Sequence, residues 1–266
     1  MNKIKIPKNR LRQLKTFSLG KKPYELENSN ADKVKLIDLC SNDYFGLTRD
    51  KDLIKASYEI SLSEGLGSGS SRFITGSRPV HKLLEDQLSE WLNQEKVLLF
   101  PSGFQANIAA IQTLVDRRSI VIADKLIHNS LIVGIKAAQS KLIRFAHNNL
   151  KDLEDKICKF NSDNTSILVV VESLYSMEGS IAPLKEITEI CKKYKVELLV
   201  DEAHAIGILG PQGKGLSFNF SDSVTMITGT FGKAFGSGGA FIACNSKMGE
   251  YLIQTSGAFR YTTALS

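Results

Sequence analysis

One lysine stands in a glycine-rich segment that could bring it against a bulky ligand. Lys233 follows Thr230 by three residues in the stretch 228–239, which contains five glycines. A lysine in a closed, partly desolvated pocket has a lowered pKa and can form a Schiff base with an aldehyde. Glycines let the backbone turn sharply and approach a ligand closely, and the Thr230 hydroxyl could bind a phosphate beside the imine. The segment therefore suggests covalent chemistry at Lys233 on an aldehyde cofactor.

Two other glycine-rich motifs fit this stretch poorly. A phosphate-binding P-loop needs Gly-x-x-x-x-Gly-Lys-Ser/Thr, but Ile227 stands at the first glycine and Ala234 at the hydroxyl. A dinucleotide fingerprint also fails, because Gly236-x-Gly238 runs directly into Gly239. A glycine-rich turn with a solvent-exposed lysine is the remaining alternative, and the rest of the chain has to decide.

Short apolar runs alternate with amphipathic segments from residue 97 onward. We expect strands over 97–100, 120–123, 142–145, 167–172, 196–200, 224–228 and 240–243. We expect helices over 51–64, 79–93, 103–115, 131–138, 150–160 and 183–194. Apolar strands separated by amphipathic helices predict an α/β fold, with a mainly parallel sheet and helices on both faces. In such sheets ligands bind at the carboxyl ends of the strands.

Polar side chains recur at these predicted strand ends. Asp201 and His204 follow one strand, His128 opens the helix after another, and Glu172 ends a third. Each has an ordinary alternative: Asp201 could cap a helix, His204 could be a core histidine, and Glu172 could pair with a nearby lysine. The segment Ser102-Gly103-Phe104 leads from a strand into a helix, whose N-terminal amides could bind a phosphate.

Together these residues supply what an aldehyde-bearing pyridine phosphate needs. Lys233 supplies the imine, and Asp201 can keep the ring nitrogen protonated so that the ring acts as an electron sink. His204 can bond the ring hydroxyl, and His128 can stack on the ring. The phosphate would be bound by Thr230 and by the amides of Ser102, Gly103 and Phe104.

Composition places the chain among ordinary globular proteins. Of 266 residues, 42% are hydrophobic and 23% charged, and the formal net charge of +6 comes largely from a basic N-terminal run. That run could bind nucleic acid or attract an anionic substrate, but a solvated helix face is favoured. No array of aromatic and basic residues accompanies it, so no nucleic-acid partner is expected.

The cysteine pattern and the apolar runs indicate a cytoplasmic location. Four scattered cysteines without a C-x-x-C pair favour reduced thiols over a disulfide framework or a zinc site, and no metal is expected. No signal peptide or membrane-spanning run is evident. We expect an N-terminal basic helix, about Asn9 to Leu19, within a linker segment over 1–40, and a large domain over 41–266.

Several motifs together resemble the α-oxoamine synthases, which are pyridoxal-phosphate enzymes of fold type I. The motifs lie at 41–47, 67–72, 201–204, 210–215 and 230–233, and the resemblance runs from Leu36 to the last residue. Within the family, Ser102-Gly-Phe-Gln-Ala-Asn and Asp201-Glu-Ala-His with Gly210-Pro-Gln-Gly are most similar to the branch that makes 8-amino-7-oxononanoate. The cofactor implied is pyridoxal 5'-phosphate (PLP), bound by a large domain of this chain.

The resemblance implies a decarboxylative condensation in biotin biosynthesis. L-alanine would react with a pimeloyl thioester, carried by coenzyme A or a carrier protein, giving 8-amino-7-oxononanoate, carbon dioxide and free thiol. Lys233 would remove the α-proton, His128 and Asn42 would bind substrate, and Ser176 would lie near the cofactor ring. The alternative is the same chemistry with glycine or serine and another acyl-coenzyme A.

The resemblance also implies a homodimer with shared active sites, in which Thr262 and Thr263 reach the phosphate of the neighbouring subunit. Family members continue past Ser266 into a smaller C-terminal domain carrying a substrate-carboxylate arginine. This chain stops at that junction, so a fragment, a natural short form and a non-catalytic PLP-binding protein all stay open. The family's N-terminal acyl-contacting arginine could correspond to Arg12 or to 21–23.

Overall fold

Near the N-terminus, the chain forms a small antiparallel sheet. The computed structural model describes residues 7, 10–22, 24–28, 35–162 and 165–266, in compact units over 1–42 and 43–266. The sheet of the first unit has the order β1-β2-β3. Its strands are β1 (Phe17–Leu19), β2 (Glu25–Asn28) and β3 (Lys35–Ile37). After β3, the Asp38 carboxylate accepts the N–H groups of Cys40 and Ser41, at 2.9 and 3.0 Å, and turns the chain.

The helix expected over Asn9–Leu19 is not formed. Asn9 lies outside the described residues, residues 11–16 have no regular secondary structure, and residues 17–19 form β1. Leu11 and Leu14 are both exposed. An isolated helix of this length is marginal in water unless an apolar face packs against something. The prediction was wrong because β1 pairs with β2 instead.

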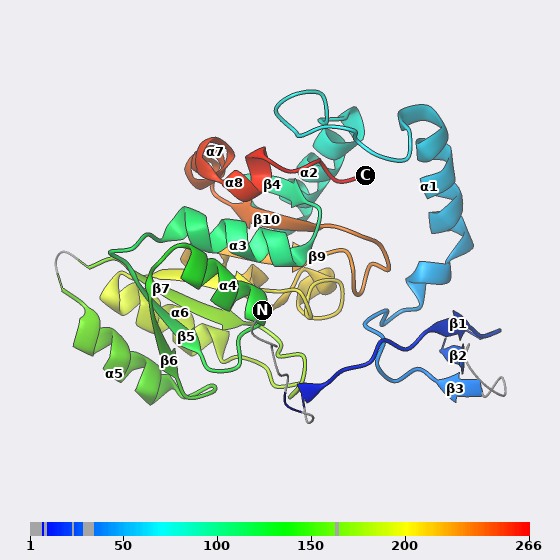
Figure 1. Cartoon of the computed structure of the whole chain (residues 1–266). Helices are drawn as coiled ribbons and strands as arrows, with labels where there is room; N and C mark the ends of the chain where they lie inside the picture. Colours follow the sequence, from blue (N-terminus) through cyan, green and yellow to red (C-terminus); the bar gives the residue numbers. More distant parts are fainter. Residues whose placement is uncertain (1–6, 8–9, 23, 29–34, 163–164) are drawn as a thin grey trace, which may run out of the picture. The chain divides into compact units, whose positions relative to one another are not determined.

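Among the described residues, the second unit contains a sheet of seven strands in the order β4-β10-β9-β8-β7-β5-β6 (Figure 1). Its strands are β4 (Lys96–Phe100), β5 (Ile120–Asp124), β6 (Lys141–Phe145), β7 (Ile167–Glu172), β8 (Glu197–Asp201), β9 (Met226–Thr230) and β10 (Ala240–Cys244). Neighbouring strands are parallel except at β10, which runs antiparallel to both β4 and β9. This confirms the mainly parallel sheet and the fold type I class.

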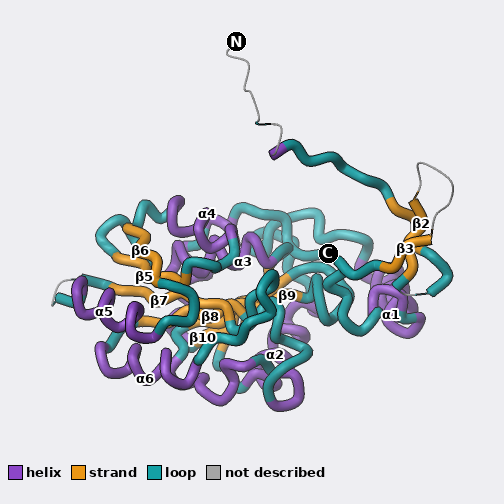
Figure 2. Tube along the Cα trace, turned by 90° about the horizontal axis from the view of Figure 1, so that it is seen from below, coloured by secondary structure: helices purple, strands orange, loops and turns teal. Residues whose placement is uncertain are grey.

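Helices cover both faces of this sheet, as expected (Figure 2). They are α2 (Pro79–Leu92), α3 (Gly103–Leu114), α4 (Asn129–Ala137), α5 (Leu150–Phe160), α6 (Leu184–Tyr194), α7 (Ser246–Thr255) and α8 (Gly257–Arg260). One core contains Leu88 of α2, Leu153 of α5 and Ile187 of α6. The other contains residues of α3, α4 and α7, including Leu131 and Leu252.

Strand β7 shows why the central strands are apolar throughout. Val169 and Val171 belong to the core on one face, whereas Leu168 and Val170 belong to the core on the other. All six residues of the strand are buried. Because a strand alternates its side chains between two faces, a strand covered on both sides needs apolar residues at successive positions.

Helix α1 (Lys51–Glu64) has the bounds expected from its sequence. Asp50 begins it, because its side chain accepts the N–H groups of Asp52 and Leu53, both at 3.0 Å. Gly65 ends it with φ 86° and ψ 167°, a conformation that only glycine adopts readily. No residue of α1 is buried.

The glycine- and serine-rich loop between α1 and α2 is anchored by an ion pair. Arg72 donates to both carboxylate oxygens of Glu85, at 2.8 and 3.0 Å. The two side chains are only 12% and 8% exposed. Glu85 also accepts the N–H of Leu99 on β4 at 3.0 Å. The arginine thus fastens the loop to α2 and to the edge of the sheet.

The glycine-rich loop after β8 wraps around a buried carboxyl group. Glu202 is fully buried, accepting from Ser173 Oγ at 2.5 Å and from Ser217 N at 2.6 Å. A Cβ at Gly215 would lie 2.8 Å from the Glu202 carboxyl carbon, and the φ of Gly215 is 88°. Burial raises the pKa of Glu202. Glycine is required here both for space and for backbone conformation.

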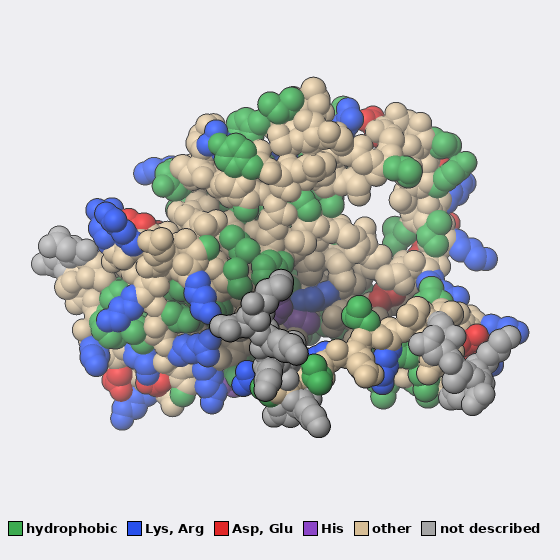
Figure 3. Space-filling view, viewed as in Figure 1, with side chains coloured by type: hydrophobic (Ala, Val, Ile, Leu, Met, Phe, Trp, Pro, Cys, Tyr) green, Lys and Arg blue, Asp and Glu red, His purple; other side chains and the backbone are tan. Residues whose placement is uncertain are grey.

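Charged side chains of both signs are mixed on the face drawn in Figure 3, where basic residues (blue) lie among acidic and hydrophobic ones. Among the described residues, none of the helices combines the length and apolar character needed to cross a membrane.

Candidate active site

A cavity of about 190 Å³ opens where the expected site residues converge. It lies at the carboxyl ends of β7, β8 and β9 and at the beginning of α3. Its lining includes Gly103, Phe104, His128, Asp201, His204, Thr230 and Lys233. Histidine side chains (purple) are visible in Figure 3. Residues from several elements and loops thus meet at the strand ends, as the parallel sheet predicted.

Lys233 lies against a histidine inside this cavity. Its Nζ is 2.7 Å from Nε2 of His204, and the other ring nitrogen of His204 lies 2.8 Å from the Tyr44 hydroxyl. A protonated lysine can only donate, so Nε2 accepts and the ring proton sits on Nδ1, which faces Tyr44. Tyr44 is 160 residues away in sequence from His204, and no local pattern indicates this contact.

The electrostatics of this pair suit an amine that must lose its proton. Burial lowers the pKa of Lys233, although Asp201 and Glu172 act in the opposite direction. Burial, and then the nearby charge of Lys233, lower the pKa of His204 to about 4. The imidazole is therefore neutral at pH 7 and can accept the lysine proton in a hydrogen bond.

Asp201 ends β8 with its carboxylate held by two donors. Oδ1 accepts the N–H of Ala203 at 2.9 Å, and Oδ2 accepts Nδ2 of Asn107 at 2.7 Å. Both the aspartate and the asparagine are 4% exposed. Asn107 follows Gly103 by one turn of α3, so both face the cavity. That spacing is the one sequence signal that could have identified Asn107 as part of the site.

A second buried carboxyl group lies beside Asp201. Glu172 pairs with Asp201 in the register of β7 and β8 and also lines the cavity. Burial, and then the nearby charge of Asp201, raise the pKa of Glu172 to about 8. Two neighbouring carboxylates in a site of low dielectric avoid ionising together. Glu172 therefore holds a proton at neutral pH.

The expected phosphate seat lies between α3 and β9. Ser102 caps α3, accepting the N–H of Gln105 at 3.3 Å, and its side chain is not part of the cavity lining. A Cβ at Gly103 would lie 3.6 Å from Cβ of Thr230, so the two segments approach closely. The Thr230 hydroxyl donates to Gly239 O at 2.9 Å. It would have to rotate away from Gly239 to donate to a phosphate.

Only some of the other expected residues line the cavity. His128 caps the beginning of α4 and lines the cavity. Its ring lies edge-on to the ring of Phe104, with 6.5 Å between the ring centroids. Ser176 does not reach the cavity: it is exposed in the turn after β7, while its neighbour Tyr175 takes the buried position. Asn42 belongs to the first unit. Thr262 and Thr263 are outside the lining too, and their expected roles remain predictions.

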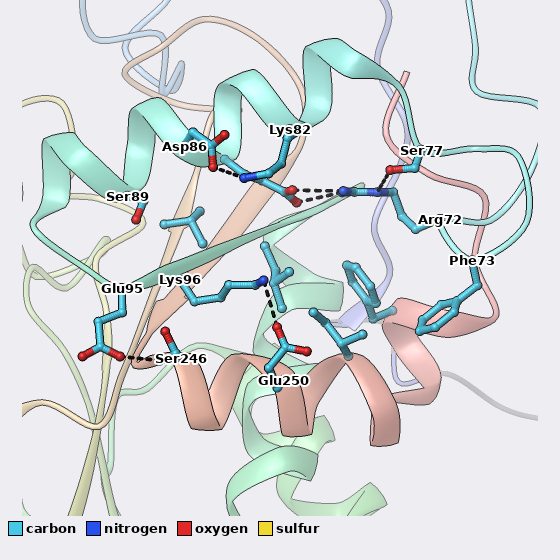
Figure 4. Close-up of a pocket in the computed structure, with 15 residues that line it drawn as sticks. Arg72, Phe73, Ser77, Lys82, Asp86, Ser89, Glu95, Lys96, Ser246 and Glu250 are labelled. Carbon is cyan, nitrogen blue, oxygen red and sulfur yellow. Dashed lines mark hydrogen bonds and ion pairs between the residues drawn. The ribbon is translucent and has the colours of Figure 1, made fainter.

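A larger cavity, about 460 Å³, lies elsewhere, between α2, β4 and α7 (Figure 4). Most of its charged groups form ion pairs, with Arg72 on Glu85, Lys96 on Glu250 at 3.0 Å, and Lys82 on Asp86. Glu95 instead accepts the N–H of Ser246 at 2.7 Å. No histidine is among its lining residues, and both of its lysines are held in ion pairs. This cavity is larger than the one that contains Lys233, but the chemistry of the side chains favours the smaller one.

Comparisons with known proteins agree with this geometry. Residues 34–266 match the family model "Aminotransferase class I and II". The chain belongs to the aminotransferase class I and II family. It is 41% identical over 235 residues to the 8-amino-7-oxononanoate synthase of Hydrogenovibrio crunogenus, covering 87% of this chain and 59% of that protein. The chain therefore spans about three fifths of the length of this relative.

Solved structures of the same family superpose closely on this chain. A serine palmitoyltransferase from S. paucimobilis with a bound PLP–myriocin aldimine has a TM-score of 0.89 at 30% identity. The match covers 95% of this chain and 63% of that one. An 8-amino-7-oxononanoate synthase from Francisella tularensis has a TM-score of 0.73 at 32% identity, covering 85% and 63%. The resemblance to PLP-dependent α-oxoamine synthases is confirmed.

Proposed function

We propose that this chain is the cofactor-binding part of a PLP-dependent acyltransferase that condenses L-alanine with a pimeloyl thioester. The products would be 8-amino-7-oxononanoate, carbon dioxide and the free thiol of coenzyme A or of a carrier protein. The observation that carries the proposal is the 2.7 Å contact between Lys233 Nζ and His204 Nε2, in one cavity with Asp201 and His128.

The side chains of the cavity fit PLP. A lysine with a lowered pKa, a buried aspartate and the beginning of α3 offer an amine for the aldehyde, an anion for the ring nitrogen and amides for the phosphate. We assign these roles to Lys233, to Asp201 and to Gly103 and Phe104 with Thr230. Ser102 would contribute through its backbone, since its side chain caps α3.

When bound, PLP supplies an electron sink for negative charge at the substrate's α-carbon. The protein's part is to place proton-transfer groups around that carbon. Lys233 would take the α-proton, which requires the neutral amine that burial favours. His204 would bond the ring hydroxyl, and Asp201 would hold the proton on the ring nitrogen. His128 would cover the ring and contact the substrate.

The remaining parts of the proposal concern substrate and assembly. Asn42 would bind near the substrate carboxylate, and Thr262 and Thr263 would complete the phosphate site of a second copy in a homodimer. These roles are supported by the resemblance of the motifs around them and by the 41% identity to an 8-amino-7-oxononanoate synthase.

Absorption spectroscopy tests the cofactor assignment. We expect the purified chain to acquire a visible band on addition of PLP, and Lys233→Ala to lack it. Lys185→Ala, an exposed position on α6, is the matched control and should keep the band. A folded parent chain that takes up no PLP, or a band that survives in Lys233→Ala, would overturn the proposal.

A second candidate uses serine in place of alanine, and the TM-score of 0.89 to a serine palmitoyltransferase favours it. Glycine is the third amino acid that this chemistry can use. Thiol release from pimeloyl-coenzyme A, measured with alanine, glycine and serine in turn, separates the three. Release with alanine well above the other two supports our proposal, and release only with serine or glycine would replace it.

A further inference from the structure

Asn107 makes three side-chain hydrogen bonds at the base of the cavity. Its Nδ2 donates to Asp201 Oδ2 at 2.7 Å and to Ser130 Oγ at 2.9 Å. Its Oδ1 accepts from Thr228 Oγ1 at 2.7 Å. The four residues come from α3, β8, α4 and β9, and all are at most 4% exposed. A single amide therefore ties together four elements behind the cavity.

The donors and acceptors around this amide fix its orientation. Thr228 has a hydroxyl proton to give to Oδ1, and Asp201 can only accept. Turning the amide over would place Oδ1 against the aspartate carboxylate, with two acceptors facing each other. Ser130 accepts the second N–H and lies 2.7 Å from Nδ1 of His128, to which it can donate. Hydrogen bonds are therefore donated from Thr228 to Asn107 and from Asn107 to Asp201. A second branch is donated from Asn107 to Ser130 and from Ser130 to His128.

We propose that Asn107 is a positioning residue of this site, whose amide, oriented by Thr228, holds the Asp201 carboxylate in the direction needed to bond the cofactor ring. This inference rests on the proposed function, because it assigns the ring nitrogen to Asp201. Ala203 N–H bonds only Oδ1, so Asn107 supplies the donor that fixes Oδ2. Without it, a buried carboxylate would keep an unsatisfied oxygen and could rotate away.

The pH dependence of the lysine-bound cofactor's absorption reports this positioning. An aspartate aligned with the ring nitrogen keeps the ring protonated, and a protonated ring withdraws electrons and lowers the pH at which the lysine–cofactor bond takes up its proton. Misalignment should therefore move the midpoint of this transition to higher pH. A loss of structure alone would reduce the amount of bound cofactor without moving the midpoint.

The sharpest test is the pair Thr228→Val and Thr228→Ser. Valine matches threonine in shape but has no hydroxyl to orient the amide, whereas serine retains it. We expect the valine variant to move the midpoint upward by about one pH unit, the effect of losing one strong hydrogen bond. The serine variant should return it to the parent value. Thr113→Val, at a buried threonine of α3 that bonds only Ala109 O, is the control and should leave it unchanged.

Asn107→Ala tests the amide directly. We expect its affinity for PLP to fall at least tenfold, in line with the loss of a hydrogen bond to a charged group. If Asn107→Ala does not fold, the comparison of Thr228→Val with Thr228→Ser still tests the inference. A midpoint that is equal in Thr228→Val and in the parent would overturn the inference. A parent chain that binds no PLP would instead contradict the proposed function, so the two failures are distinguishable.

Discussion

Lys233 and His204 are in direct contact in the cavity, with 2.7 Å between Nζ and Nε2. The two groups affect each other, since the charge of the lysine is one cause of the lowered pKa of His204. Burial is the larger cause for both. The pair therefore favours a neutral imidazole and an amine that gives up its proton more readily than a lysine in water.

Stability should fall in acid because of His204. Its folded-state pKa of about 4 lies below the ordinary value of 6.5, so the unfolded chain binds the proton more readily between these values. The stability that the neutral His204 side chain provides is complete above about pH 6.5 and is lost as the pH falls toward 4. We expect the difference in unfolding free energy between the parent and His204→Gln to shrink over this window. A constant difference from pH 7 to pH 4, measured by denaturant unfolding, would contradict this.

Glu172 should give stability the opposite dependence on pH, with a loss at high pH. Its folded-state pKa of about 8 lies above the ordinary 4.5, so the folded chain holds the proton more tightly and loses stability as the pH rises through this window. Glu172→Gln cannot ionise, and its stability relative to the parent should increase from pH 5 to pH 9. Glu178→Gln, at an exposed position in the turn after β7, should show no such trend. Equal trends in both variants would argue against a proton on Glu172.

Removing the Arg72 side chain should strongly destabilise the folded chain. Arg72→Ala leaves Glu85 buried without its partner, which typically destabilises a protein by about 3–5 kcal/mol. Arg118→Ala removes an ion pair to Asp116, but those side chains are 85% and 52% exposed, and ion pairs that are open to water contribute little to stability. Urea unfolding of both variants measures the contrast. Similar losses would show that the Arg72 pair is not a buried anchor.

Gly215→Ala should be worse than Gly65→Ala, although the two glycines share a backbone conformation. Gly65 has φ 86° and ψ 167°, and Gly215 has φ 88° and ψ 165°. A Cβ at Gly65 would meet nothing closer than 3.9 Å, whereas one at Gly215 would lie 2.8 Å from the Glu202 carboxyl carbon. The two variants should share the backbone strain, and the clash should add about 1–3 kcal/mol at Gly215. Thermal unfolding at equal pH compares them.

Much of the second unit could be predicted from the sequence. The bounds of α1, α5 and β7 agree with the expected 51–64, 150–160 and 167–172. These elements depend on local signals: capping residues, a 3.6-residue apolar period, or an unbroken apolar run. The parallel sheet and the placement of site residues at strand ends followed from the order of the elements.

Other features depended on contacts that no local pattern contains. β10 inserts between β4 and β9 and runs antiparallel to both. Residues 17–19 pair as a strand where a helix was expected. Ser176 is exposed because the neighbouring Tyr175 takes the buried position in that turn. In each case, packing or pairing with a distant segment outweighed the weak preference of a short stretch.

The sequence by itself determined the kinds of chemistry available, because Lys233, Asp201, His204 and His128 are recognisable by type and by position after predicted strands. Only the tertiary structure decided which groups touch. The contacts of Asn107 with Asp201 and of Tyr44 with His204 join residues 94 and 160 positions apart. Hydrogen bonds of this kind require donor and acceptor to meet within about 3 Å. That distance is set by how the sheet and its helices pack, and not by the spacing of residues along the chain.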